Sequence, residues 1–193
     1  MEICFFCKKR LPNPATSRSP LNDSWHYECP RCGIVHVSDT LAVISDPEIE
    51  KNRHIISGVL RWRSIRKIKY SLLTTDNFKD LLSDPEIPQT IPQKIDKLIE
   101  FMALRSGAFG APVDLNNDED YPITFSSGRL EFDQILSYLQ KHKVIETASL
   151  SDPGSTLSMD GWKMYYDLQK KRVDLSQCFV AMNFDPSYDH AFQ

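Results

Sequence analysis

Two cysteine pairs near the start of the chain, Cys4-Phe5-Phe6-Cys7 and Cys29-Pro30-Arg31-Cys32, are the strongest chemical signal in the sequence. Each pair can place two thiolates on one side of a tight turn. Two such turns that face each other form a tetrahedral site with four sulfur ligands. The second pair is followed directly by Gly33, a residue suited to the tight turn. The sequence therefore predicts a metal site with four thiolate ligands.

We expect Cys4, Cys7, Cys29 and Cys32 to bind a structural Zn²⁺ ion. Four thiolates close the coordination sphere, so the site has no open position for catalysis. A rubredoxin-like iron site uses similar ligands and stays open as an alternative. A pair of disulfides is disfavoured, because cysteines in metal-ligand spacing are typical of a reducing compartment.

Residues 1–46 are predicted to form a zinc ribbon around this site. The aromatic stretch from Ser24 to Glu28 is strand-like, and Ile34 to Val37 is predicted to return as the second strand of a hairpin. A module this short buries little core, so metal binding would supply most of its folding free energy. His26 and His36 are interpreted as strand residues that could in principle replace a ligand.

The overall composition is that of an ordinary globular protein. Of the 193 residues, 41% are hydrophobic and 25% are charged, and the net charge of −3 does not suggest a polyanion binder. The first residues lack the basic region of a signal peptide, and no apolar run of about 18 residues is present. We therefore expect a cytoplasmic protein without a membrane partner.

Residues 47–93 are predicted to be a helical connector. Asp46, Pro47 and Glu48 have the pattern of a helix start, and a second helix is expected from about Thr75 to Leu82. The segment has 8 basic and 6 acidic side chains, a net charge of +2. A nucleic-acid contact is one interpretation of its basic cluster, and a solvated helix face is the favoured one. The cluster consists of Arg61, Arg63, Arg66, Lys67 and Lys69.

Residues 94–171 have the element order of a winged helix. Pro92 is expected to open a first helix that ends at Gly107, and a second helix is expected from about Arg129 to His142. A hairpin from Val144 to Ser158 and a closing helix follow. The segment has 9 basic and 12 acidic side chains, a net charge of −3, which disfavours binding to phosphates. The acidic stretch from Asp114 to Asp120 is interpreted as a solvated loop.

Residues 172–193 contain the motif Phe179-Val180-Ala181-Met182-Asn183-Phe184-Asp185. Together with the cysteine pairs, this motif resembles a family of multi-domain bacterial proteins. These have an N-terminal zinc ribbon, a winged-helix middle and a C-terminal Rossmann-like domain related to nucleoside 2-deoxyribosyltransferases and TIR-like modules. The resemblance implies an α+β chain in which residues 172–193 supply only the first strand of a truncated last domain.

The leading functional hypothesis is a non-catalytic regulatory or adaptor region whose partner is another protein or the missing C-terminal domain. A role in stress or phage defence is implied by the resemblance alone. The first alternative is a DNA-binding regulator that uses the ribbon and the basic cluster. The second alternative is an inactive fragment of an enzyme that processes nucleosides or nucleotides. No residue of the chain is predicted to be catalytic.

Overall fold

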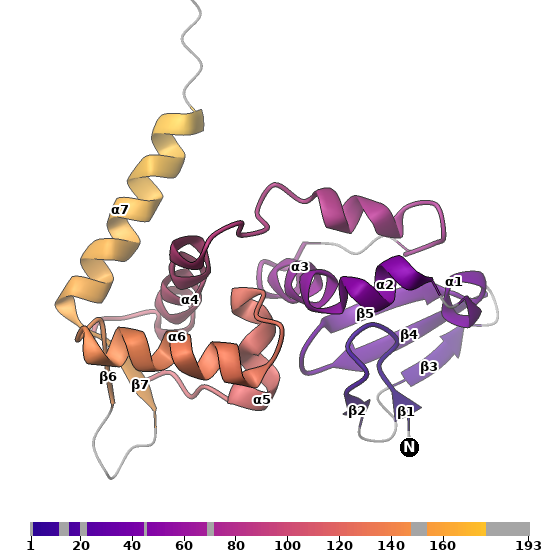
Figure 1. Ribbon diagram of the computed structural model, residues 1–193, viewed down its shortest axis with the longest axis horizontal. Coiled ribbons are helices and arrows are strands. Elements are labelled where there is room, and N and C mark those ends of the chain that lie inside the picture. Colours follow the sequence, from indigo (N-terminus) through magenta and orange to yellow (C-terminus); the bar gives the residue numbers. More distant parts are fainter. Residues whose placement is uncertain are drawn as a thin grey trace, which may run out of the picture.

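The computed structural model describes residues 2–11, 16–19, 23–44, 46–68, 72–147 and 154–176. It combines helices with small antiparallel sheets, which confirms the predicted α+β class. The strands of the N-terminal part and the long helices that follow lie side by side, and the last helix extends away from the body (Figure 1). The motif at residues 179–185 lies outside the described residues.

Two antiparallel sheets form the N-terminal part. Strands β1 (Glu2–Ile3) and β2 (Arg10–Leu11) pair with each other, and the turn between them carries the first cysteine pair. Strands β3, β4 and β5 make a three-stranded sheet with β4 in the middle. The turn between β4 and β5 carries the second cysteine pair, so the predicted hairpin is confirmed. The three strands span Thr16–Ser19, Ser24–Cys29 and Gly33–Ser38.

Three helices follow the sheet. The hydroxyl oxygen of Ser38 accepts a hydrogen bond at the start of α1 (Asp39–Val43), and the carboxylate of Asp46 does the same for α2 (Pro47–Lys51). The predicted helix start at residues 46–48 is therefore confirmed. Helix α3 (Arg53–Ile65) packs against β5 and against a short helix from the second half of the chain, η2 (Tyr121–Thr124).

The connection to the second half differs partly from the prediction. Instead of an α-helix over residues 75–82, the chain forms a 3₁₀ helix, η1 (Phe78–Ser83), which ends just before Pro85. Helix α4 (Ile91–Ser106) begins with a capping box formed by Thr90 and Gln93. It ends at Gly107, which has the left-handed conformation that closes many helices (φ 65°).

The second half combines α4 with shorter elements and a final helix. The chain returns as a bridge at Val113, which pairs with Ser155 of the β-hairpin. Two consecutive short helices then lead to α6, and the hairpin leads to α7. These elements are α5 (Asn117–Asp120), η2 (Tyr121–Thr124), α6 (Arg129–Lys141), β6 (Ile145–Thr147), β7 (Ser155–Leu157) and α7 (Met159–Ser176).

One continuous core joins the two halves. Buried apolar side chains run from the cysteine turns through α3 to α4, α6 and the hairpin. At the junction the indole nitrogen of Trp62 donates a hydrogen bond to the carbonyl oxygen of Ile123 at 2.8 Å. The ring of Phe125 lies against Gly58, where no larger residue would fit. Of the helices that the structure describes, none is both long and apolar enough to cross a membrane.

Candidate metal centre

The four predicted ligands come together in the structure. The sulfur atoms of Cys4, Cys7, Cys29 and Cys32 all lie within 4.8 Å of one another, and none of the four thiols forms a disulfide. The Cys4 and Cys32 sulfurs are 3.8 Å apart, and those of Cys7 and Cys29 are 3.4 Å apart. A tetrahedral metal with sulfur ligands at about 2.3 Å requires sulfur–sulfur distances of about 3.8 Å. The tetrad therefore fits a tetrahedral metal ion.

The two cysteine turns share a backbone feature, a left-handed residue directly after the second cysteine. The residue after each pair, Lys8 or Gly33, has a positive φ, 57° and 80° respectively. In the first turn the amide of Lys8 donates to the carbonyl of Cys4 at 3.1 Å, and the amide of Cys4 donates to the carbonyl of Lys9 at 2.9 Å. Only glycine adopts this conformation without strain, so the first turn holds a strained lysine where the second has glycine.

The thiols are shielded from solvent and perturb one another. Cys4, Cys29 and Cys32 are buried, and Cys7 is partly buried. Hydrogen bonds shared with Cys29, Cys4 and Cys7, and then complete burial, raise the pKa of the Cys32 thiol. Hydrogen bonds from Cys32, Cys4 and Cys7 lower the pKa of Cys29. Four thiolates at this spacing repel one another, so this donor set is suited to a bound cation.

Helix α3 covers one side of the tetrad. The hydroxyl of Ser57 is 3.4 Å from the Cys32 sulfur and can donate to it in the thiolate form. One turn earlier, the guanidinium of Arg53 donates to the carbonyl of Phe5 at 3.1 Å and also to that of Phe6. Residues four apart share a helix face, so Arg53 and Ser57 hold one cysteine turn each.

The acidic segment covers another side of the tetrad. The Arg31 side chain donates from Nε to the carbonyl of Asp118 at 2.7 Å and lies over the ring of Tyr121 at 4.8 Å. Lys9 forms an ion pair with Glu119 at 3.5 Å. Burial raises the pKa of Tyr121. The nearby charge of Arg31 acts in the opposite direction, and the charges of the tetrad sulfurs add to the increase in pKa. The interpretation as a solvated loop is wrong for residues 117–120, which form α5 and contact Arg31 and Lys9 of the cysteine turns.

The arginines of the basic cluster contact carboxylates of the chain itself. Arg61 pairs with the buried Asp120 at 2.8 Å, and Arg63 pairs with Asp84 at 3.4 Å. Arg66 pairs with two glutamates, as described below. Lys67 is exposed, and Lys69 lies outside the described residues.

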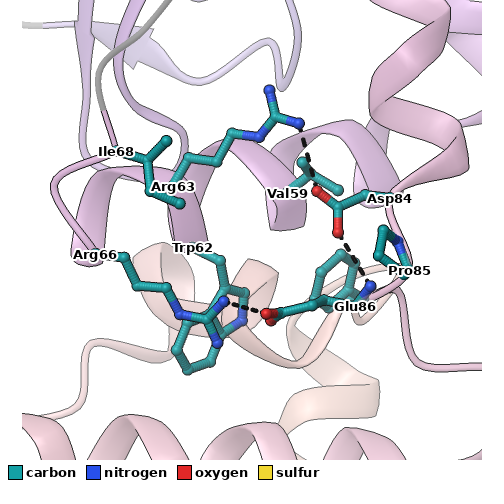
Figure 2. A pocket seen from close by; sticks show the side chains of 9 residues that line it. Val59, Trp62, Arg63, Arg66, Ile68, Asp84, Pro85 and Glu86 are labelled. Atoms are coloured by element: carbon teal, nitrogen blue, oxygen red, sulfur yellow. Dashed lines mark hydrogen bonds and ion pairs between the residues drawn. The ribbon is translucent and has the colours of Figure 1, made fainter. Parts of the chain in front are cut away.

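A cavity of about 450 Å³ lies between α3 and the loop after η1 (Figure 2). Its apolar wall includes Val59, Trp62 and Phe125. The charged residues of its rim pair with one another across the opening, Arg63 with Asp84 and Arg66 with Glu86. This mutual pairing favours a structural role for the rim charges over a catalytic one.

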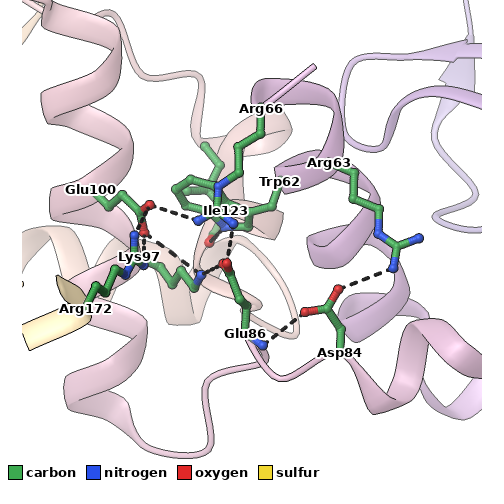
Figure 3. Close-up of polar contacts among 9 residues, drawn as sticks. All are labelled: Trp62, Arg63, Arg66, Asp84, Glu86, Lys97, Glu100, Ile123 and Arg172. Atoms are coloured by element: carbon green, nitrogen blue, oxygen red, sulfur yellow. Dashed lines mark hydrogen bonds and ion pairs between the residues drawn. The ribbon is translucent and has the colours of Figure 1, made fainter. Parts of the chain in front are cut away.

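A network of charges connects α3, α4 and α7 (Figure 3). Its centre is Glu100 on α4, which is only 4% exposed. The Glu100 carboxylate accepts two hydrogen bonds from Arg172 of α7, each 2.7 Å long, and one from Arg66 of α3 at 2.9 Å. Burial alone would raise the pKa of Glu100, but the hydrogen bond from Arg172 and the charges of Lys97, Arg172 and Arg66 outweigh it and lower the pKa.

Glu86 and Lys97 complete this network. Lys97 is buried and reaches Glu86 at 2.5 Å, and Glu86 also pairs with Arg66. The cations of Arg66 and Lys97 lie over the ring of Trp62 at 5.0 and 4.8 Å from its centre. The network was not predicted from the sequence. The only available signal was a pair of charges, Lys97 and Glu100, on the buried stretch of α4.

Comparison of the chain with protein-family models, with curated proteins and with solved structures gives no match.

Proposed function

We propose that the tetrad binds Zn²⁺ as a structural ion and that residues 1–46 form a zinc ribbon. The distance between the sulfurs of Cys4 and Cys32, 3.8 Å, supports a tetrahedral sulfur site, and zinc is its commonest occupant. A bound metal would cross-link the turns after β1 and β4, which belong to separate sheets. Elemental analysis should find one zinc per chain, and iron would be detected by its visible absorption.

We further propose that residues 94–171 form a winged helix. The order of elements supports this assignment: α4, the bridge at Val113, the pair α5 and η2, helix α6, and the β6–β7 hairpin. The bridge at Val113 would add a third strand to the hairpin, as in winged-helix domains. Helix α6 would then occupy the place of a DNA-reading helix.

The chain as a whole is proposed to be a non-catalytic regulatory or adaptor region that links the metal site to α7 and to whatever follows it. One observation carries this proposal: α3 touches both the metal site and the charge network. Its Ser57 contacts a ligand sulfur, and its Arg66 shares the Glu100 carboxylate with Arg172 of α7. A change at the tetrad would therefore reach α7 through two rigid helices, α3 and α4.

The DNA-binding alternative is less well supported by the surface charges. Arg61, Arg63 and Arg66 are paired with carboxylates and would have to leave them to neutralise phosphates. On α6, Glu131 pairs with Lys94, and Asp133 pairs with Arg129. Tight DNA binding that weakens steeply with salt would favour the alternative.

Hydrogen exchange of the full chain, with and without metal, tests the regulatory proposal. We expect removal of the metal to speed exchange in α4 and in α7 as well as in the cysteine turns. A loss of about 1.4 kcal/mol of local stability corresponds to tenfold faster exchange. Faster exchange confined to residues 2–43 would contradict the proposal, since the two halves would then respond independently.

Substitution of Arg172 sharpens this test. In Arg172→Gln the α7 response to metal removal should be lost while the α4 response persists, because the ion pair with Glu100 is the contact removed. Lys170→Gln is the matched control on the same helix, since Lys170 is exposed. An equal α7 response in Arg172→Gln and in the control would show that the network does not couple the two helices.

A further inference from the structure

A second group of metal-ligating side chains lies on the three-stranded sheet, outside the tetrad. His26 on β4 and His36 on β5 are direct cross-strand partners. The Nδ1 atom of His26 is 3.3 Å from the Nε2 atom of His36, and the two rings are tilted by 62°. Val35 and Val37, the neighbours of His36 in β5, are buried on the opposite face. The two histidines therefore share the outer face of the sheet.

Glu28 determines which nitrogen of His26 faces its partner. The Glu28 carboxylate is 3.2 Å from Nε2 of His26, and a carboxylate partner favours the tautomer in which this nitrogen carries the proton. The lone pair of Nδ1 then points toward His36. Metal-binding histidines commonly donate their other N–H to a carboxylate in this way, which fixes the ring and increases the basicity of the ligand.

The spacing of the two nitrogens fits a shared metal ion. A tetrahedral ion with nitrogen ligands at about 2.0–2.1 Å requires a nitrogen–nitrogen distance of about 3.3–3.4 Å. The observed 3.3 Å is in this range. We propose that His26 and His36 form a second metal site for a divalent ion that accepts tetrahedral geometry, such as Zn²⁺ or Co²⁺, with Glu28 as its orienting carboxylate.

The surroundings of the pair suit an exchangeable ion. The side chain of His26 is 26% exposed, which leaves room for water to complete the coordination. Burial, together with the nearby His26, lowers the pKa of His36, so its ring stays neutral and able to bind a metal. Cys29 is three positions after His26, or roughly 10 Å along the strand, so the pair and the tetrad are distinct sites.

Calorimetric titration with Co²⁺ of the full chain, already loaded with one equivalent of zinc, tests the proposal. We expect a second equivalent to bind with retention of the zinc. Either His26→Gln or His36→Gln should weaken binding by at least about tenfold, and Glu28→Ala by a smaller factor of up to about ten. His142→Gln is the control, since His142 lies at the end of α6, where it stacks on Tyr138.

A second readout needs no substitution. Paramagnetic Co²⁺ should broaden the ring-proton NMR signals of His26 and His36 before those of any other histidine. The alternative is a plain hydrogen bond between the two rings, which gives no second equivalent. The absence of a second equivalent would overturn the proposal. So would an unchanged affinity in both histidine variants, or earlier broadening of the signals of another histidine.

Discussion

Gly58 provides the sharpest test of how the two halves are joined. It lies on the buried face of α3, and a Cβ atom added there would meet three ring atoms of Phe125 at 2.5, 2.7 and 2.8 Å. Real Cβ atoms do not approach other carbons this closely. The ring cannot easily move aside, because Phe125 is 1% exposed and packs in the core that joins α3 to η2.

Two effects of opposite sign act in Gly58→Ala. Alanine in a helix interior is favoured over glycine by about 1 kcal/mol. Overpacking of a filled core costs about 1–3 kcal/mol, and here the clash involves a whole aromatic ring. The expected net result is destabilisation by up to about 2 kcal/mol. For a chain of this length, each kcal/mol corresponds to a fall of about 2–4 °C in Tm.

Thermal and denaturant unfolding of the full, metal-loaded chain would measure this change. Phe125→Leu alone should cost about 1–2 kcal/mol, but Gly58→Ala should become neutral or stabilising in its presence. Ser64→Ala, a partly exposed position on the same helix, is the control and should change stability by less than about 0.5 kcal/mol. A Gly58→Ala protein that is more stable by about 1 kcal/mol would refute the close packing of α3 on Phe125.

Three further predictions follow from the metal site and the charge network. Cys29→Ser should lower the bound metal found by elemental analysis and unfold the cysteine turns, and full retention of metal would contradict the assignment. Gly33→Ala should lower the free energy of unfolding by about 1 kcal/mol, because Gly33 has a φ of 80°. Lys8→Gly should raise the free energy of unfolding by about 0.5–1 kcal/mol, because it relieves the strain at Lys8. Denaturant unfolding measures both changes. Burial tends to raise the pKa of Glu86, but hydrogen bonds from Arg66 and Lys97 lower it to about 2, below its usual 4.5. This contribution to stability is complete above pH 4.5 and is lost as the pH falls toward 2. Because the side chain is 39% exposed, a pH series of unfolding curves should show only about 1 kcal/mol of it, absent in Glu86→Gln.

Local patterns in the sequence were sufficient to predict the metal ligands and the ends of several helices. The spacing of the four cysteines predicts their convergence without any knowledge of the fold, because each pair shares one turn. The start of α2 at Pro47 and the end of α4 at Gly107 were predictable for the same reason. The helix ends, and each cysteine pair taken by itself, depend on residues that are close together in the sequence.

The partners of α3 could not be predicted in this way. Arg61 pairs with Asp120, which is 59 positions away, and Arg66 pairs with Glu100, which is 34 positions away. Periodicity identifies the buried face of a helix but not the helix that covers it. A cluster of arginines therefore has the same sequence pattern whether it faces phosphates or carboxylates of its own chain. The same limit applies to the acidic segment, whose contact with Arg31 forms only in the folded chain.

From the position of Glu100 we infer that the charge network fixes the orientation of α7 more than it increases the stability of the fold. A buried ion pair is often no more stabilising than apolar side chains of similar size, because desolvation of the charges offsets their attraction. Apolar side chains could, however, slide along one another, whereas the two parallel hydrogen bonds between Glu100 and Arg172 have one geometry. Arg66 of α3 donates to the same carboxylate, so the network relates the orientation of α7 to that of α3. Replacement of the whole triad by apolar residues, Glu100→Leu with Arg66→Met and Arg172→Met, should therefore cost little stability and should release α7, and unfolding curves and hydrogen exchange on this variant would measure the two effects separately. Glu100→Leu alone leaves the cations of Arg66, Lys97 and Arg172 with only Glu86 and should be the more destabilising change, by about 3–5 kcal/mol.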